Sequence, residues 1–119
     1  MGPTIITDTD PSRIFALLPD ITEKDKLLII QACDFAKKAH EGQLRKSGEP
    51  YYNHVFATGM NLAALKMDAE TIAAGILHDV LEDTPVTSPE MTEAFNEHIT
   101  KLVEGVTKLG KLRYSGIVS

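Results

Sequence analysis

Apolar residues in this chain recur three and four positions apart, which is the spacing of one face of an α-helix. The clearest apolar stripe lies within residues 22 to about 40, and its members are Leu28, Ala32, Phe35, Ala36 and Ala39. No segment alternates apolar and polar residues over the length of a β-strand. The pattern therefore predicts an all-α fold.

Helix caps and helix-breaking residues divide the chain into about six predicted helices. Asp10 and Pro11 begin a short helix that ends by Pro19, and Gly42 follows the end of the helix over residues 22 to about 40, which Thr22 caps. Residues 43–52 are polar and predict a loop. The later helices have candidate caps or breaks at their starts, namely Asn53, Asp68, Thr87 with Glu90 at capping-box spacing, and Asn96.

Composition limits the class of protein. The 119 residues suffice for one modest domain, and 43% hydrophobic with 24% charged residues is ordinary for a globular chain. A net charge of −5 argues against a general nucleic-acid surface, and no apolar run is long enough to span a membrane. Cys33 is the single cysteine, so no disulfide forms within the chain, which fits a cytoplasmic location; we expect Cys33 to be a small buried residue.

The predicted helix over residues 69–82 carries the most chemical information. It is apolar on nearly every side, which predicts a place in the core, yet its end carries His78, Asp79, Glu82 and Asp83. Burying carboxylates at the negative end of a helix is unfavourable, and no Lys or Arg lies between Met67 and Lys101 to offset them. A bound divalent cation would relieve both costs.

Spacing supports a metal site. His78 and Glu82 are four residues apart, as are Asp79 and Asp83, so these groups lie on one side of the helix. Imidazole with carboxylate suits Mn²⁺, Fe²⁺ or Zn²⁺. A lone His-Asp pair at a helix end is more often solvated, but the apolar helix and two further carboxylates favour a site.

The other histidines differ in their surroundings. His54 follows the loop at the start of a helix, from which a side chain can reach a neighbouring helix end, so it is a candidate third ligand. His40 and His98 have no acidic or apolar cluster around them in the sequence, and we expect both at the surface. In the loop, Arg45-Lys46-Ser47-Gly48 groups donors that suit phosphate or a base, although alone it is a weak signal.

Several motifs together resemble one family. The histidine, then His-Asp order is that of the HD superfamily of metal phosphohydrolases. The chain more specifically resembles the RelA/SpoT hydrolase domain over residues 22 to 114, in the runs AKKAHEGQ (36–43), RKSGEPY (45–51), AETIAA (69–74), LHDVLEDT (77–84) and GVTKL (105–109).

The resemblance implies an HD-domain helical bundle that uses Mn²⁺ to remove the 3′-pyrophosphate of guanosine tetra- or pentaphosphate. Carried over position by position, its site residues are metal ligands at His54, His78 and Asp79, catalytic carboxylates at Glu82 and Asp83, and nucleotide contacts at Arg45, Lys46 and Ser47.

The chain departs from the family in two ways. Val55 stands where the family usually has a proline after the first ligand histidine. The family's fourth ligand, an aspartate on a later helix, has no counterpart, since no acidic residue follows Gly105. We therefore expect residues 1–21 to be a leader with a short helix, 22–114 a partial hydrolase domain incomplete at its C-terminal end, and 115–119 a tail. If the helices that close the family's domain are missing, apolar surface would be exposed, and two copies of the chain could cover it by forming a homo-oligomer.

Two other functions stay open. One is a catalytically inactive domain that binds guanine nucleotides or regulates a protein partner, although the presence of all five motif residues from His54 to Asp83 argues against decay. The other is a different HD-type nucleotide phosphohydrolase, which the Arg45–Gly48 loop makes the less favoured interpretation.

Overall fold

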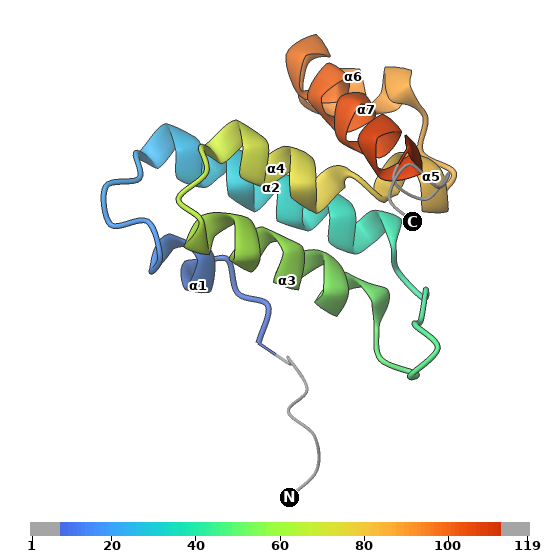
Figure 1. The fold of residues 1–119 in the computed structure, drawn as a ribbon, viewed down its shortest axis with the longest axis horizontal. Helices are drawn as coiled ribbons and strands as arrows, with labels where there is room; N and C mark the ends of the chain where they lie inside the picture. The colour runs from blue at the N-terminus through green and yellow to red at the C-terminus, as the bar shows by residue number, and fades with distance from the viewer. Residues whose placement is uncertain (1–7, 113–119) are drawn as a thin grey trace, which may run out of the picture.

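A computed structural model of the chain describes residues 8–112, and the side chains of residues 8–106. These residues form helices joined by loops, with one isolated bridge between Leu44 and Pro50 and no strand. The helices are α1 (Ser12–Phe15), α2 (Glu23–Ala39), α3 (Tyr51–Ala64), α4 (Ala69–Leu77), α5 (Val80–Asp83), α6 (Ser88–Ala94) and α7 (Glu97–Leu112) (Figure 1). The all-α prediction is confirmed, and none of the described helices could cross a membrane.

Helix α4 lies at the centre of the bundle. It packs against α2, α3 and α7, while α1 packs against α3 and α6 against α7. Figure 1 shows α2, α3 and α4 side by side, with α5, α6 and α7 gathered toward one end of them. Nearly all of α4 is buried, as its apolar composition predicts; the buried residues are Ala69, Ile72, Ala73, Ala74, Gly75, Ile76 and Leu77.

Most predicted helix starts are confirmed by side-chain caps. Each cap accepts a hydrogen bond from a backbone N–H of the first turn, which has no partner within the helix. The pairs are Thr22 with Asp25 at 3.2 Å, Asp68 with Thr71 at 2.8 Å, and Asn96 with Ile99 at 2.8 Å. Helix α1 instead has Pro11 at its N-cap, and the Asp10 carboxylate accepts the Ser12 N–H at 2.9 Å from the residue before it. Thr87 and Glu90 form the reciprocal capping box that their spacing predicts.

The predicted start of α3 is wrong. The helix begins at Tyr51, directly after Pro50, and Asn53 lies inside its first turn rather than capping it. Pro50 has a φ of −55°, which suits a helix entrance, and its carbonyl accepts the Asn53 N–H at 3.1 Å. This start places both Tyr51 and His54 in the first turn of α3.

The predicted helix over residues 69–82 is divided at His78 and Asp79 into α4 and α5. The His78 Nδ1 atom lies 2.6 Å from the carbonyl oxygen of Gly75. In an unbroken α-helix that oxygen would accept the Asp79 N–H, so the side chain competes for the acceptor and interrupts the helix. The division explains why seven helical segments are described where about six helices were predicted.

Candidate active site at the junction of α4 and α5

The junction of α4 and α5 presents an imidazole and a carboxylate together. His78 Nε2 lies 3.0 Å from Asp79 Oδ1, and the side chains are only 27% and 14% exposed. The Nδ1 atom of His78 is turned back onto Gly75, which directs Nε2 toward Asp79. The polar end of a buried helix therefore carries two partly buried, ordered groups that are candidate metal ligands.

The charges of this pair stabilise each other. The hydrogen bond to Asp79 raises the pKa of His78 above its usual value, and burial opposes this shift. Burial by itself would raise the pKa of Asp79, but hydrogen bonds from His78 and Tyr51, with the nearby His78 and His54 rings, hold it below its usual value. Asp79 is therefore an ionised carboxylate at neutral pH.

Tyr51 joins the first turn of α3 to this junction. Its hydroxyl donates a hydrogen bond to Asp79 Oδ2 at 2.6 Å and lies 3.4 Å from Asp83 Oδ2. Burial, together with the two carboxylates, raises the pKa of Tyr51 well above its usual value, so the hydroxyl stays a donor. The structure thus brings Asp79 and Asp83 to one phenol.

The remaining predicted site residues lie around this group. His54 is half-buried, its ring lies edge-on to the Tyr51 ring at a centroid distance of 5.6 Å, and it contributes to the field at Asp79. Glu82 and Asp83 are exposed on α5, and Glu82 lies near enough to influence the His78 charge. The structure therefore brings the predicted ligands and carboxylates to one end of the bundle.

The loop between α2 and α3 lies at the same end of the bundle as α5 (Figure 1). Arg45, Lys46 and Ser47 are exposed on it, and the ion pairs found among the described residues involve neither basic side chain. The Arg45 N–H donates to the Glu49 carbonyl at 2.9 Å, and Gly48 has a φ of 91°, which closes the turn. The loop is ordered by its backbone while its donors face solvent.

The prediction that His40 lies at the surface is wrong. Its side chain is 2% exposed, its Nδ1 lies 2.9 Å from Gln43 Oε1, and its ring lies 4.9 Å from the Tyr51 ring. The loop folds back over the end of α2, which burial patterns within α2 do not reveal. His98 is exposed as expected and pairs with Glu70 at 3.3 Å.

Sequence reasoning assigned no role to Tyr51, which is in contact with the junction. The sequence pattern placed it inside the predicted loop over residues 43–52, and only its place in the RKSGEPY run marked it. Only the packing of α3 on α4 shows that its hydroxyl reaches Asp79. Cys33 is buried as predicted, at 2% exposed.

The donor chemistry of the junction suits a divalent cation. Ligand histidines commonly donate one ring N–H to a backbone carbonyl, as the Nδ1 of His78 does to Gly75; a metal ion would take the place of the proton on Nε2, beside Asp79 Oδ1. Among residues 8–112, however, no three His, Cys, Asp or Glu side chains lie close enough to hold a metal ion together. The chemistry of the His78–Asp79 pair suits a metal ion, and His54 as the third ligand stays a prediction.

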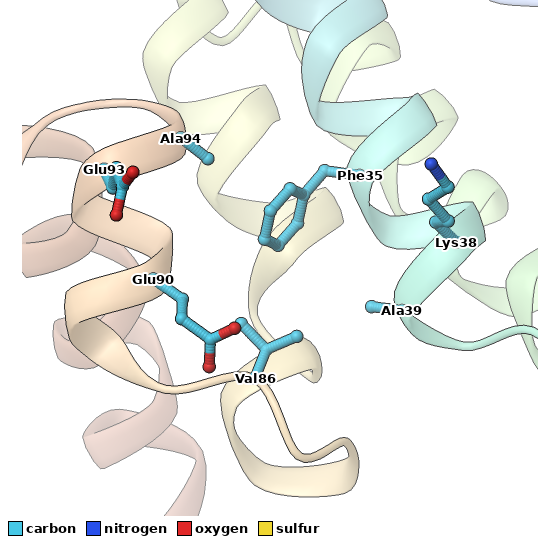
Figure 2. A pocket seen from close by; sticks show the side chains of 7 residues that line it. All are labelled: Phe35, Lys38, Ala39, Val86, Glu90, Glu93 and Ala94. Carbon is cyan, nitrogen blue, oxygen red and sulfur yellow. The ribbon is translucent and has the colours of Figure 1, made fainter.

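A pocket of about 600 Å³ lies elsewhere, between α2 and α6. Figure 2 shows Phe35 of α2 reaching toward Ala94 of α6, while Val86 lies next to Glu90; the other lining residues are Lys38, Ala39 and Glu93. None of the predicted site residues lines it. Because Glu90 is already engaged in the capping box, this largely apolar hollow offers few polar groups to orient a ligand.

The fold and the His-Asp junction are those of a known class of protein. Residues 32–116 match the family described as HD domain, so the chain belongs to the HD domain family.

The matched region corresponds to the N-terminal hydrolase region of RelA/SpoT proteins. The chain is 54% identical over 107 residues to a guanosine-3′,5′-bis(diphosphate) 3′-pyrophosphohydrolase of Aquifex aeolicus, covering 90% of this chain and 15% of that protein. It is 51% identical over 84 residues to the bifunctional (p)ppGpp synthase/hydrolase SpoT of Escherichia coli, covering 71% and 12%. A GTP pyrophosphokinase of Myxococcus xanthus is 44% identical over 97 residues, covering 82% and 13%. The chain thus spans a small fraction of these relatives.

Proposed function

We propose that this chain is the N-terminal part of a hydrolase that removes the 3′-pyrophosphate of guanosine tetra- or pentaphosphate, and that it carries metal-binding and nucleotide-binding residues of that enzyme. The observation that carries the proposal is the His78–Asp79 pair, 3.0 Å apart at the end of a buried helix. The names of its relatives support the substrate, because the Aquifex and Escherichia proteins are named for this hydrolysis.

Each residue of the junction has a task in this proposal. His54, His78 and Asp79 would hold Mn²⁺, which lowers the pKa of bound water and polarises the phosphoryl oxygen. Glu82 and Asp83 are exposed on α5 beside these ligands, so a carboxylate is within reach to orient the attacking water and accept its proton.

The loop residues would bind the nucleotide. The guanidinium of Arg45 can stack on guanine or bind phosphate in a fork, Lys46 supplies a point charge, and Ser47 supplies a hydroxyl. Their exposure at the same end of the bundle as α5 supports this role. In a chain with a net charge of −5, basic groups without carboxylate partners favour an anionic ligand.

A second candidate is a domain that binds the nucleotide without hydrolysing it. It is favoured by the spacing of the side chains, because no three candidate ligands among the described residues are close enough for one ion. Such a domain would still use the loop at Arg45–Ser47 and would tolerate loss of Asp79.

Pyrophosphate release from guanosine tetraphosphate with added Mn²⁺ separates the two candidates. We expect release by the wild-type chain, loss of release with a chelator, and no release by Asp79→Ala. The matched control is Asp34→Ala, which removes an exposed carboxylate from α2 and should keep full activity.

Nucleotide affinity, measured by calorimetry on the same proteins, completes the test. Binding without release, unchanged in Asp79→Ala and weakened in Arg45→Ala, would contradict hydrolysis and favour the binding domain. Neither release nor binding would contradict both candidates.

A further inference from the structure

The two oxygens of the Asp79 carboxylate have different partners. Oδ1 lies 3.0 Å from His78 Nε2, and Oδ2 accepts the Tyr51 hydroxyl at 2.6 Å. The Tyr51 contact crosses from α3 to the junction of α4 and α5, over 28 positions of sequence. A hydrogen bond to one oxygen restricts rotation of the carboxylate, so it also sets the direction of the other oxygen.

The Tyr51 ring contacts two histidine rings. The buried ring of His40 lies 4.9 Å from the Tyr51 ring, and the ring of His54 lies 5.6 Å from it. The Tyr51 N–H donates to the Gln43 carbonyl at 2.9 Å, and Gln43 Oε1 contacts His40. Because backbone and ring are both anchored, the hydroxyl meets Asp79 with little further loss of conformational entropy.

We propose that Tyr51 is a positioning residue whose hydroxyl orients the Asp79 carboxylate so that Oδ1 stays beside His78 Nε2 as a metal-ligand pair. The inference rests on the proposed function in taking His78 and Asp79 as metal ligands. Hydrogen bonds to ligand carboxylates from outside the coordination shell typically change metal affinity by about 10- to 100-fold when they are removed. Tyr51 also ends the loop that begins beside His40, so the same side chain links the loop to the ligand pair.

A purely structural role for Tyr51 predicts a different experimental result. If Tyr51 served only to fasten α3 to α5, loss of its hydroxyl would lower stability without a specific effect on metal binding. Tyr51→Phe keeps the ring contacts with His40 and His54 and removes only the hydroxyl. Tyr52→Phe is the matched control, because Tyr52 is the next residue, is 7% exposed, and has its hydroxyl near Cys33 rather than Asp79.

The test measures the Kd of the full chain for Mn²⁺ alone, from the electron paramagnetic resonance signal of the free ion. Thermal unfolding is measured in parallel. We expect Tyr51→Phe to raise the Kd about 10- to 100-fold. We expect Tyr52→Phe to keep the wild-type Kd, even where it lowers stability.

Three outcomes would overturn the proposal: a wild-type Kd in Tyr51→Phe, equal losses of affinity in the two variants, or no Mn²⁺ binding by the wild-type chain. Pyrophosphate release is measured separately. A wild-type chain whose Mn²⁺ binding depends on the Tyr51 hydroxyl, yet which releases no pyrophosphate, would contradict the proposed function and leave the role of Tyr51 supported.

Discussion

Gly59 of α3 lies against Ile76 of α4 so closely that a Cβ at Gly59 would be 2.9 Å from Ile76 Cγ1. Ile76 is fully buried, and Ile14 closes the same space at 3.3 Å. The absence of a side chain at this position lets the two helices approach, and the same approach brings Tyr51 to Asp79.

Gly59→Ala should destabilise the fold. Both isoleucines are fully buried, so overpacking should lower the free energy of unfolding by about 1–3 kcal/mol, offset in part by the better helix propensity of alanine. Urea denaturation measures the change. Gly105→Ala is the control, because a Cβ there meets nothing within 4 Å. It should raise stability by up to about 1 kcal/mol, and equal effects of the two substitutions would contradict this account.

Asp68 should stabilise α4 in a pH-dependent way. Hydrogen bonds from the Thr71 hydroxyl and amide hold the pKa of the Asp68 carboxyl below its usual value. A lowered folded-state pKa means that the contribution of the charge is complete above the unfolded value of about 4. It is then lost as the pH falls through the lower folded value.

The comparison is with Asp68→Asn, which keeps a capping side chain but removes the charge at the helix N-terminus. We expect the wild type to be more stable by about 0.3–1 kcal/mol at pH 7, with the difference shrinking below pH 4. Urea denaturation across the pH range measures it. A difference that stays constant from pH 7 to pH 2 would show that the charge contributes nothing.

Cys33 should react slowly while the chain is folded. Burial raises the pKa of its thiol to about 11, and the side chain is 2% exposed. At pH 8 the thiolate, which is the reactive form, is therefore scarce as well as shielded. A chromogenic disulfide reagent should label the native chain far more slowly than the urea-unfolded chain. Similar rates in both states would contradict the packing of α2.

His40→Ala should loosen the loop that carries the proposed nucleotide contacts. The substitution removes the ring beside Tyr51 and the contact with Gln43, and should lower the free energy of unfolding by about 1–3 kcal/mol. Hydrogen exchange of the Arg45 and Gly48 amides, which hydrogen-bond within the loop, should accelerate. In His98→Ala, which removes an exposed side chain, neither quantity should change appreciably; unchanged exchange in His40→Ala would show that the loop does not depend on this contact.

The predictions from sequence succeeded where the physics is local. Thr22, Asp68 and Thr87 cap their helices because a short polar side chain reaches an N–H three residues away. They failed at Asn53, where the adjacent proline already set the helix start, and at His78, whose side chain interrupts the helix that its apolar neighbours predict.

The amino-acid pattern alone predicts a helical chain, a buried α4, and groups suited to a metal at the polar end of that helix. Which of these groups come into contact depends on how the helices pack. The packing of α3 on α4 brings the Tyr51 hydroxyl to Asp79. The loop between α2 and α3 folds over the end of α2 and buries His40. Helical periodicity reports which face of one helix is apolar. The contact between Tyr51 and Asp79, which are 28 positions apart, depends on how closely two separate helices approach each other. The periodicity within one helix holds no information about that distance.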